Sequence, residues 1–520
     1  MKSLHWADFA ADKIIREKGD KEEYVLASGI TPSGTVHFGN FREVITVDLV
    51  ARALRAKGKK VKFIFSWDDY DTFRKVPSDM PNEDELANYL YQPIVDTPCP
   101  YGERDSYAQY HERVFESQLE KMGIEVEYRY QAYKYRNGDY KESIKLALDK
   151  ASEIRDILNK HRTTPLAEDY LPVSVYCEKC NTDHQISNKR WDGENLTYSC
   201  DNCGNEGSIP HSHPNIKLPW RVDWAMRWAY ESVDFEPGGK DHSSEGGSFS
   251  TGQDIVRLFG GEAPVYLQYD FVSLKGGPGK LSSSSGNVIT VDDLLQIYPP
   301  EIIRYIYSNA KPNRDFSIDL ELGLLRTYEE FDRLERVAYD SSLAPKKFEL
   351  NSRVYDYSLV SERTDNILKV VSFRELCDTY QTYRCDVQQT LNYYREGLNE
   401  AELSRLENRI NCVHNWINLY APEEFKFSLN EETPSLDLSS AQLDFVTLLI
   451  DVLNTKWNEL DGASLQQEIY DIKNDIGLEP NEVFEPLYQI LISKNKGPRL
   501  ANFILSIPKD QVMNLLKKAL

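Results

Sequence analysis

Residues 23–67 read EYVLASGITPSGTVHFGNFREVITVDLVARALRAKGKKVKFIFSW, and this stretch decides the fold. Residues 23–30 (EYVLASGI) predict a short strand, which is followed by the turn-forming sequence TPSGT. Apolar residues at helical spacing predict a helix over 40–57, ended by Gly58. Residues 61–67 form a nearly continuous apolar run, which is typical of a buried parallel strand. Strand, turn, helix and strand together predict a right-handed βαβ unit, and therefore an α/β protein with a parallel sheet.

The alternation of strands and helices continues beyond this unit. Residues 107–122 and 139–160 predict helices, and residues 124–130 and 264–274 predict strands. Residues 171–213 are rich in cysteine and glycine and have little periodicity, which indicates an insertion. From about residue 296 onward the pattern is helical, as in 322–340, 356–398, 399–417, 440–458, 464–475, 478–492 and 508–519.

These patterns predict a Rossmann-type parallel-sheet domain followed by an all-α C-terminal half. A chain of 520 residues is too long for one compact core, so several domains are expected. We expect the two halves of the α/β domain at 1–165 and 216–295, with the insertion at 166–215 between them. A connecting helical region at 296–350 and a second helical region at 351–520 then complete the chain.

Composition excludes few classes of function. The net charge of −22 favours solubility and argues against indiscriminate nucleic-acid binding, although local basic strips remain compatible with an RNA partner. No apolar run approaches the ~20 residues that cross a bilayer. The N-terminal sequence MKSLHWADFAADKIIREKGD lacks the uninterrupted apolar stretch of a secretion signal. We therefore expect a soluble, cytoplasmic protein with no membrane partner.

Two loops have the composition of a phosphate-binding site. The first, residues 31–40 (TPSGTVHFGN), is a turn that leads into a helix N-terminus, where backbone N–H groups and the helix dipole favour an anion. His37 and Asn40 are three residues apart and project to one side of the first turn. Alternatively, TPSG is an ordinary turn and His37 caps the helix or lies in the core.

The second loop is residues 275–287, KGGPGKLSSSSGN. Its alternative interpretation is a disordered Gly/Ser linker. However, it directly follows a predicted buried strand and precedes a predicted helix start at 290–293, which is a poor position for a linker. A P-loop is excluded because Leu274 stands where its first glycine is required and Leu281 follows Lys280.

HFGN at 37–40 and KLSSS at 280–284 resemble the HIGH and KMSKS signatures of class I aminoacyl-tRNA synthetases. The context is most similar to that of the class I lysyl-tRNA synthetases. The similar stretches, all within residues 27–292, are ASGITPSGTVHFGNFRE, FSWDDYDTFRKVP, LPWRVDWAMRW, FEPGGKDHSSEGGSF and QYDFVSLKGGPGKLSSSSGNVI. The resemblance implies that ATP and Mg²⁺ activate an amino acid as its adenylate, which then esterifies the terminal adenosine of a tRNA.

The resemblance also assigns roles in the ATP site. His37 and Asn40 would contact the phosphates, Lys280 would neutralise the leaving pyrophosphate, and Ser282, Ser283 and Ser284 would assist it. The other residues that it places around ATP are Pro32, Ser33, Gly34, Gly39, Asp241 and Val272, with adenine held by the backbone around 271–273. Such a site acts by positioning and charge stabilisation rather than by covalent chemistry.

Lys280 is expected to be especially sensitive to substitution. Asn40 stands at the last HIGH position, and Ser283 stands where the family often has a second lysine, so one full positive charge remains in the second loop. We expect Lys280→Ala to lower the rate of adenylate formation about ten-fold or more, because the charge on pyrophosphate loses its counterion. ATP–pyrophosphate exchange measures this rate, and a near wild-type rate would refute the role of Lys280.

A lysine pocket needs an acceptor-rich wall for the ammonium and aromatic walls for the carbon stem. By resemblance, lysine would lie among Gly29, Thr31, Trp220, His242 and Tyr269, with Asp68 or Asp223 as the anion. The first loop, LASGITPSG, lacks the arginine that a glutamate pocket requires, which favours lysine.

Two groups in this region have competing structural interpretations. In the alternative interpretation, the three aspartates of this segment have no role in a lysine pocket and form structural ion pairs with Arg74 and Lys75; they are Asp68, Asp69 and Asp71. Trp224 and Trp228, at helical spacing from Trp220, are expected to pack as a helix face, whereas Trp220 is expected to precede the helix.

Cys177-x2-Cys180 and Cys200-x2-Cys203 have the spacing of a zinc ribbon. Four thiolates leave no open coordination position, so the predicted role of Zn²⁺ is structural. Four free thiols remain the alternative, and His184, His211 and His213 are alternative ligands. Cys99, Glu103 and His111 could form a second metal site, but Arg104 stands where a ligand would be expected, and that site stays unassigned.

The resemblance implies an α-helical anticodon-binding region in the C-terminal half. The basic segment at 494–499 (KNKGPR) is more typical of solvated surface than of an RNA contact. The expected partners are L-lysine and tRNA(Lys), and a monomer is expected. Three alternatives remain: a glutamyl-type enzyme, a non-catalytic synthetase-like protein that binds tRNA or ATP, and a nucleotidylyltransferase of the same superfamily.

Overall fold

The computed structural model describes residues 4–78, 80–102, 105–276 and 288–520. The chain forms two compact units. The first unit comprises Met1–Leu295, Pro300–Ile318 and Val337–Thr364, and the second comprises Gln296–Pro299, Asp319–Arg336 and Asp365–Leu520.

A five-stranded parallel sheet forms the centre of the first unit. Its strands are β1 (Glu23–Ile30), β2 (Lys60–Trp67), β3 (Glu127–Tyr130), β9 (Phe235–Gly239) and β10 (Val265–Tyr269), in the order β10-β9-β1-β2-β3. β1 and β2 pair along their whole length, with Glu23 opposite Lys60 and Ile30 opposite Trp67. The predicted βαβ unit and parallel sheet are therefore confirmed.

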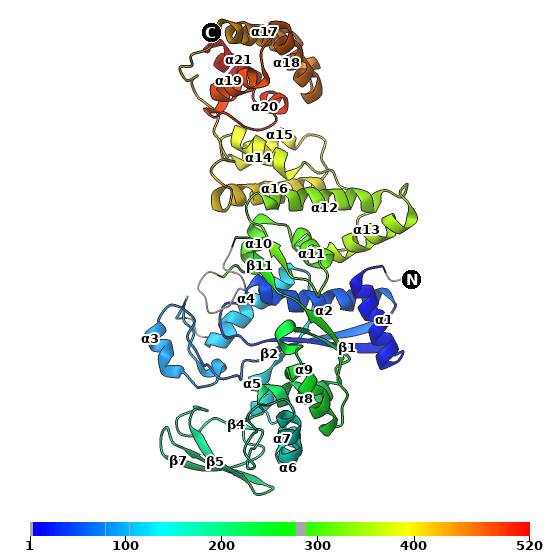
Figure 1. Ribbon diagram of the computed structural model, residues 1–520, viewed down its shortest axis with the longest axis vertical. Helices are drawn as coiled ribbons and strands as arrows, with labels where there is room; N and C mark the ends of the chain where they lie inside the picture. The colour runs from blue at the N-terminus through cyan, green and yellow to red at the C-terminus, as the bar shows by residue number, and fades with distance from the viewer. Residues whose placement is uncertain (1–3, 79, 103–104, 277–287) are drawn as a thin grey trace. The chain divides into compact units, whose positions relative to one another are not determined.

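The order of the strands places a crevice between β1 and β9. The helix α2 (Phe38–Ala56) connects β1 to β2, and α9 (Ser248–Leu258) connects β9 to β10 in the opposite direction. Because such crossovers are right-handed, the two helices lie on opposite faces of the sheet, as Figure 1 shows. Ligands of open α/β sheets bind at the carboxyl ends of the strands where the direction reverses.

The sequence did not predict three local features. The run 264–274 divides at residues 270–271 into β10 and β11 (Val272–Leu274), and β11 leaves the central sheet to pair with β12 (Phe316–Ile318). A continuous apolar run does not indicate where a strand changes its partner. The helical region 139–160 is interrupted at Lys150, between α6 and α7. Trp220 does not precede α8 (Trp220–Glu231) but is its first residue, because Pro219 is the N-cap.

The first unit contains further helices besides α2, α8 and α9. Their bounds are α1 (Trp6–Lys18), α3 (Glu83–Leu86), α4 (Tyr107–Lys121), α5 (Gln131–Arg136), α6 (Lys141–Asp149), α7 (Ala151–Asn159), α11 (Pro300–Asn309) and α13 (Pro345–Ser358). The helix α10 (Val291–Ile297) begins in the first unit, and α12 (Gly323–Tyr339) ends there.

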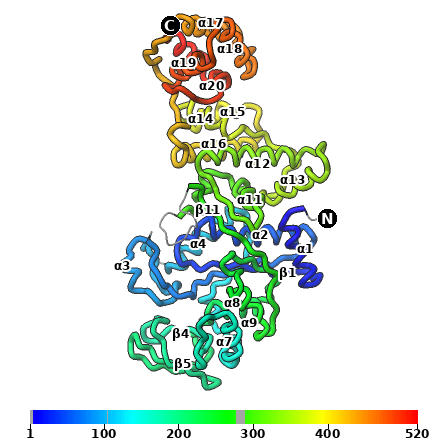
Figure 2. The backbone as a smooth tube through the Cα atoms, viewed as in Figure 1, coloured from blue at the N-terminus to red at the C-terminus, as the bar shows by residue number. Residues whose placement is uncertain are grey.

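The predicted insertion contains two small antiparallel sheets, and Figure 2 shows the path of the chain through them. One sheet consists of β5 (Ile186–Trp191), β6 (Asn195–Cys200) and β7 (Asn205–Pro210). The other pairs β4 (Ser174–Val175) with β8 (Ile216–Lys217), where the chain enters and leaves the insertion. This second pair joins the insertion to the rest of the first unit.

The described part of the second unit is helical, as predicted. Its helices are α14 (Phe373–Thr382), α15 (Val387–Tyr394), α16 (Glu400–Leu419), α17 (Ser440–Lys456), α18 (Gly462–Ile476), α19 (Pro480–Ile492), α20 (Leu500–Ser506) and α21 (Lys509–Lys517), with the first part of α12. The helical pattern predicted over 356–398 is broken twice, because residues 359–372 are not helical and positive φ angles at Arg384 (56°) and Cys385 (61°) separate α14 from α15. No helix in the described ranges is both long and apolar enough to cross a membrane.

Candidate functional site

A cavity of about 470 Å³ opens at the carboxyl ends of β1 and β9, where the topology predicts a ligand. The sequence-predicted residues that line it are Gly29, Thr31, Ser33, Gly34, His37, Gly39, Asn40, Asp68, Trp220, Asp241, His242, Tyr269 and Val272. Pro32 and Asp223 are not part of the lining. Lys280, Ser282, Ser283 and Ser284 lie outside the described residues. Most of the described residues predicted for ATP and for the amino acid therefore line one cavity.

The first turn of α2 forms one end of the cavity. The His37 side chain is the N-cap, and its Nδ1 accepts hydrogen bonds from the backbone N–H groups of Gly39 (3.0 Å) and Asn40 (3.3 Å). Since Nδ1 is an acceptor, the neutral imidazole carries its proton on Nε2. The capping interpretation of His37 is thus confirmed, and it is compatible with a phosphate contact through Nε2.

Asn40 completes this helix start. Its Oδ1 accepts a hydrogen bond from the backbone N–H of His37 at 3.2 Å, so its amide nitrogen is the donor that it retains for a ligand. Gly39 is required because a Cβ atom there would lie 2.8 Å from the His37 ring. Two polar side chains and a helix N-terminus thus face the cavity, an arrangement that favours an anion.

Glu43, one turn further along α2, lies on the cavity wall and was not predicted from the sequence. Its carboxylate accepts hydrogen bonds from the Gly29 backbone N–H (3.0 Å), the Ser28 hydroxyl (3.1 Å) and the Tyr269 hydroxyl (2.6 Å). Burial raises the pKa of Glu43. Within the described ranges no arginine or lysine forms an ion pair with it. A buried carboxylate of this kind is a ready partner for a ligand cation.

Glu43 could have been found from its spacing. It follows Asn40 by three residues, which places both side chains on the same face of a helix. The face of α2 that packs against the sheet is otherwise largely apolar, so an acidic residue beside the proposed phosphate site was a signal of function.

The two aspartates predicted as anions for lysine already have basic partners. Arg227 donates to Asp68 at 2.7 Å and lies 3.5 Å from Asp223. Asp223 also accepts a hydrogen bond from the Tyr135 hydroxyl and lies 3.9 Å from the Lys217 ammonium. Burial raises the pKa of Asp68 to about 6 despite its pairing with Arg227. These carboxylates therefore need no ligand to compensate their charge.

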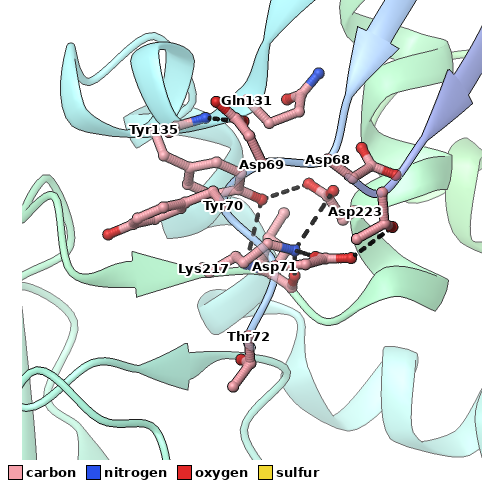
Figure 3. Close-up of polar contacts among 12 residues, drawn as sticks. Asp68, Asp69, Tyr70, Asp71, Thr72, Gln131, Tyr135, Lys217 and Asp223 are labelled. Carbon is pink, nitrogen blue, oxygen red and sulfur yellow. Dashed lines mark hydrogen bonds and ion pairs between the residues drawn. The ribbon is translucent and has the colours of Figure 1, made fainter. Parts of the chain in front are cut away.

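Lys217 extends this network of charges to Asp71, whose carboxylate lies 2.8 Å from its ammonium, and Figure 3 shows Lys217 beside both Asp71 and Asp223. Asp71 also accepts a hydrogen bond from the Thr31 hydroxyl at 3.2 Å. The alternative interpretation of this segment as structural ion pairs is confirmed for Asp68 and Asp71, but the named partners are wrong, because Arg74 contacts Asp183 and the actual partners are Arg227 and Lys217. Arg227 and Lys217 are distant in sequence from residues 68–71, which concealed the actual pairs.

Aromatic rings form the wall of the cavity at the start of α8. Trp220 stacks on Trp224 with ring centroids 5.1 Å apart, and His242 lies 6.1 Å from Trp220. Trp224 and Trp228 are 5% and 1% exposed, so their predicted packing as a helix face is confirmed. Trp220 is the ring that reaches the cavity lining, where it offers an apolar surface for an aliphatic stem.

The segment where β10 ends and β11 begins lies beside the first turn of α2, since a Cβ atom at Gly39 would lie 3.7 Å from the Val272 carbonyl oxygen. Phe271 and Val272 line the cavity there. Arg42, a buried residue of α2, donates to the backbone carbonyls of Pro312 (2.8 Å) and Arg314 (2.9 Å) next to this segment. The Pro312 carbonyl also accepts the backbone N–H of Asp270 at 2.9 Å, so these bonds support the segment next to the backbone that the resemblance assigns to adenine.

The four cysteines of the insertion lie together. Their Sγ atoms are all within 4.8 Å of one another, and the shortest separations are 3.6 Å for Cys177–Cys203 and Cys200–Cys203 and 3.7 Å for Cys180–Cys200. A tetrahedral zinc ion with Zn–S bonds of about 2.3 Å requires S···S separations of about 3.8 Å. The cysteines therefore fit a metal ion.

The alternative histidine ligands lie apart from the cysteine cluster. His184 stacks on Tyr91 with ring centroids 4.2 Å apart, and the Nδ1 atom of His213 accepts a hydrogen bond from the Asn215 backbone. At the proposed second metal site, Glu103 lies outside the described residues. The described residues contain one group that could hold a metal, and it consists of the four cysteines of the insertion.

A buried carboxyl group near the end of β2 makes stability depend on pH. Burial raises the pKa of Glu112, in α4, from 4.5 to about 9, and Asp69 adds to this effect. Below pH 4.5 the group is protonated in both the folded and unfolded states. At higher pH the unfolded chain releases a proton that the fold retains, so this group destabilises the fold increasingly up to about pH 9.

We therefore expect Glu112→Gln to raise the midpoint of urea unfolding, more strongly at pH 8.5 than at pH 6. The stability difference from the parent should grow by at most about 1.4 kcal/mol per pH unit. Glu120→Gln, at an exposed position of the same helix, is the matched control and should show no such trend. Equal effects at both pH values would contradict a raised pKa.

Comparisons with known proteins agree with the site. A family described as "tRNA synthetases class I (K)" matches residues 4–361. The chain is 44% identical to the lysine–tRNA ligase of Borreliella burgdorferi, with 100% of both chains covered. It is 43% identical to that of Treponema pallidum (99% and 98% covered) and 40% identical to that of Pyrococcus horikoshii (99% of each covered).

Proposed function

Because this chain belongs to the family of class I tRNA synthetases for lysine, we propose that it is a lysine–tRNA ligase. It activates L-lysine with ATP to form lysyl-adenylate and pyrophosphate. It then transfers the lysyl group to the 3′-terminal adenosine of tRNA(Lys) and releases AMP. The chain covers the whole length of its curated relatives, so both steps are assigned to this one polypeptide.

The charge of the cavity lining favours lysine as the amino-acid substrate. Among the described residues, its lining contains four carboxylates, of Glu43, Asp68, Asp71 and Asp241, and no arginine or lysine. Asp68 and Asp71 are paired with Arg227 and Lys217, but Glu43 has no basic partner among the described residues, so a glutamate side chain would be repelled there whereas an ammonium would be attracted. This argues against the glutamyl-type alternative.

Glu43 is the anion that we assign to the lysine ammonium, in place of Asp68 or Asp223. Its three hydrogen bonds from protein donors fix the carboxylate, and Tyr269 lies within 2.6 Å of it. The lysine stem then lies against Trp220, and the α-carboxylate is directed toward the first turn of α2. Asp68 and Asp71 remain bound to Arg227 and Lys217.

In the activation step, the lysine carboxylate attacks the α-phosphorus of ATP and pyrophosphate leaves. The backbone N–H groups at the start of α2, the His37 Nε2–H and the Asn40 amide donate to the phosphate oxygens as charge develops there. Lys280 neutralises the pyrophosphate, assisted by Ser282, Ser283 and Ser284, and Mg²⁺ accompanies ATP. Ser33, Gly34, Asp241 and Val272 hold the nucleoside.

The cysteine cluster is assigned a structural Zn²⁺. Four thiolates complete the tetrahedron, so the metal would have no free coordination position for a substrate. Its expected role is to stabilise the fold of the insertion rather than to take part in catalysis. Cys177 and Cys180 precede β5 and Cys200 is the last residue of β6, so the metal would join the two chain ends of this hairpin and stabilise the insertion.

ATP–pyrophosphate exchange with each of the twenty amino acids tests this function. We expect exchange with lysine and at least 100-fold less with any other amino acid, followed by aminoacylation of tRNA(Lys) alone among tRNAs. Exchange with glutamate only, or with no amino acid, would overturn the assignment.

A further inference from the structure

A buried arginine of α8 lies next to the substrate cavity without lining it. Arg227 is 7% exposed and is not part of the lining. Its Nη1 donates to the Asp68 carboxylate at 2.7 Å, and its Nε lies 3.5 Å from the Asp223 carboxylate. The guanidinium also faces the Trp220 ring, with 5.4 Å between its central carbon and the ring centroid. One cation therefore contacts two groups of the cavity wall, Asp68 and Trp220.

The spacing of residues along α8 explains why one cation reaches these groups. Trp220, Asp223 and Arg227 follow one another at intervals of three and four residues, so they share one face of the helix. Asp223 has another basic neighbour, since it lies 3.9 Å from the Lys217 ammonium. Asp68 has Arg227 as its ion-pair partner and no second one among the described residues. The charge of Asp68 is therefore compensated by Arg227.

Asp68 and Glu43 are two carboxylates of the same cavity, and they influence each other. Burial is the main cause of the raised pKa of Glu43, and the charge of Asp68 raises it further. Burial also raises the pKa of Asp68, to about 6, and Arg227 opposes this shift. Without protein partners, both carboxylates would attract one ligand cation. Arg227 removes Asp68 from this competition.

We propose that Arg227 is a positioning residue that determines which carboxylate of the cavity receives the side-chain ammonium of the substrate. By binding Asp68 it leaves Glu43 as the acceptor, and by facing Trp220 it keeps that ring against the aliphatic stem. The inference rests on the proposed function and on the assignment of the ammonium to Glu43.

The consequence of losing Arg227 follows from the positions of the two carboxylates. Asp68 comes directly after β2, whereas Glu43 lies in α2, so an ammonium bound to Asp68 places the amino acid differently in the cavity. The α-carboxylate is then displaced from the α-phosphorus of ATP. A displacement of about 1 Å can lower a rate by about 100-fold. Lysine bound in this way occupies the cavity without reacting.

Arg227→Met is the primary test, because methionine keeps an unbranched side chain but removes the charge. We expect kcat of lysine-dependent ATP–pyrophosphate exchange to fall about ten-fold or more. The KM for lysine should stay level or fall, because unreactive binding at Asp68 adds to productive binding at Glu43. Arg257→Met is the matched control, since Arg257 of α9 is 74% exposed at its side chain, and it should leave both constants unchanged. A ten-fold rise in the KM for lysine in Arg227→Met would overturn the proposal.

The double variant Arg227→Met/Asp68→Asn separates the positioning role from a loss of structure. Replacement of both partners of a buried ion pair is often neutral for stability, because no charge is left uncompensated. The ammonium again has Glu43 as its acceptor, so we expect kcat to return to within about three-fold of the parent value. If Arg227→Met does not fold, this variant decides the question by itself. A double variant with the urea midpoint of the parent and a ten-fold lower kcat would contradict the role of Arg227.

Glu43→Gln gives a third readout when it is combined with Arg227→Met. Since Asp68 then shares the ammonium, the loss in lysine binding caused by Glu43→Gln should be at least ten-fold smaller than in the parent. An equal loss in both backgrounds would show that Asp68 does not compete for the ammonium. Absence of lysine-dependent exchange in the parent protein would instead refute the proposed function itself.

Discussion

Replacing Glu43 by glutamine is expected to lower kcat/KM for lysine in ATP–pyrophosphate exchange by about 100-fold or more. Loss of one partner of a buried charged pair costs about 2–5 kcal/mol, because the other charge stays desolvated without compensation. Glutamine preserves an acceptor for the Gly29 N–H and the shape of the side chain, so the lost charge dominates the effect. The KM for ATP should change less than the KM for lysine, since we assign Glu43 to the ammonium and not to a phosphate.

The matched control is Glu236→Gln. Glu236 is a second buried carboxylate, 7% exposed, that accepts a hydrogen bond from the Trp228 indole at 2.7 Å and is not part of the cavity lining. Its substitution should leave the KM for lysine unchanged. Norleucine, which has the lysine stem without the ammonium, gives a second readout, because Glu43→Gln should reduce the preference for lysine over norleucine. A preference as strong as that of the parent would show that the ammonium binds elsewhere.

His37→Ala is expected to lower the rate of lysyl-adenylate formation by about 100- to 1000-fold, the usual cost of removing one donor to a developing oxyanion. It also removes the acceptor for the N–H groups of Gly39 and Asn40, which should cost about 1 kcal/mol of stability. Single-turnover adenylate formation and the urea midpoint measure the two effects separately.

His37→Asn separates the two roles of this imidazole. Asparagine is a good N-cap residue and should restore most of the stability, but its shorter side chain cannot place an N–H donor where the Nε2 of histidine lies. We therefore expect a stable variant that is still at least ten-fold slower than the parent. Recovery of the full rate would mean that His37 acts only as a helix cap.

Local signals were sufficient to predict the sheet and most of the cavity lining. β1, α2 and β2 are adjacent in sequence, and apolar periodicity together with turn residues determines all three. Since the carboxyl ends of parallel strands meet at one edge, the residues around His37 and Asp68 could be placed together from the amino-acid sequence alone.

Contacts between distant segments could not be predicted. Asp68 is paired by Arg227 of α8, and Asp71 by Lys217 of β8, and nothing near residues 68–71 indicates either partner. The same limit explains why Glu43 was missed, because its role depends on Tyr269 at the end of β10. The change of sheet after Tyr269 depends on a partner strand, β12, that follows about 40 residues later.

The helix α2 carries both His37, at its N-cap, and Glu43, in its second turn. At a rise of about 1.5 Å per residue, these two groups are separated by about 9 Å along a rigid axis. If Glu43 binds the ammonium and His37 the α-phosphate, the helix is a spacer of fixed length between the two ends of the amino acid. On this assignment ornithine, which is one methylene shorter, cannot satisfy both ends at once, so we expect selection of the side chain by length as well as by charge. A missing methylene typically costs about 1–3 kcal/mol, which corresponds to a 10- to 200-fold preference for lysine.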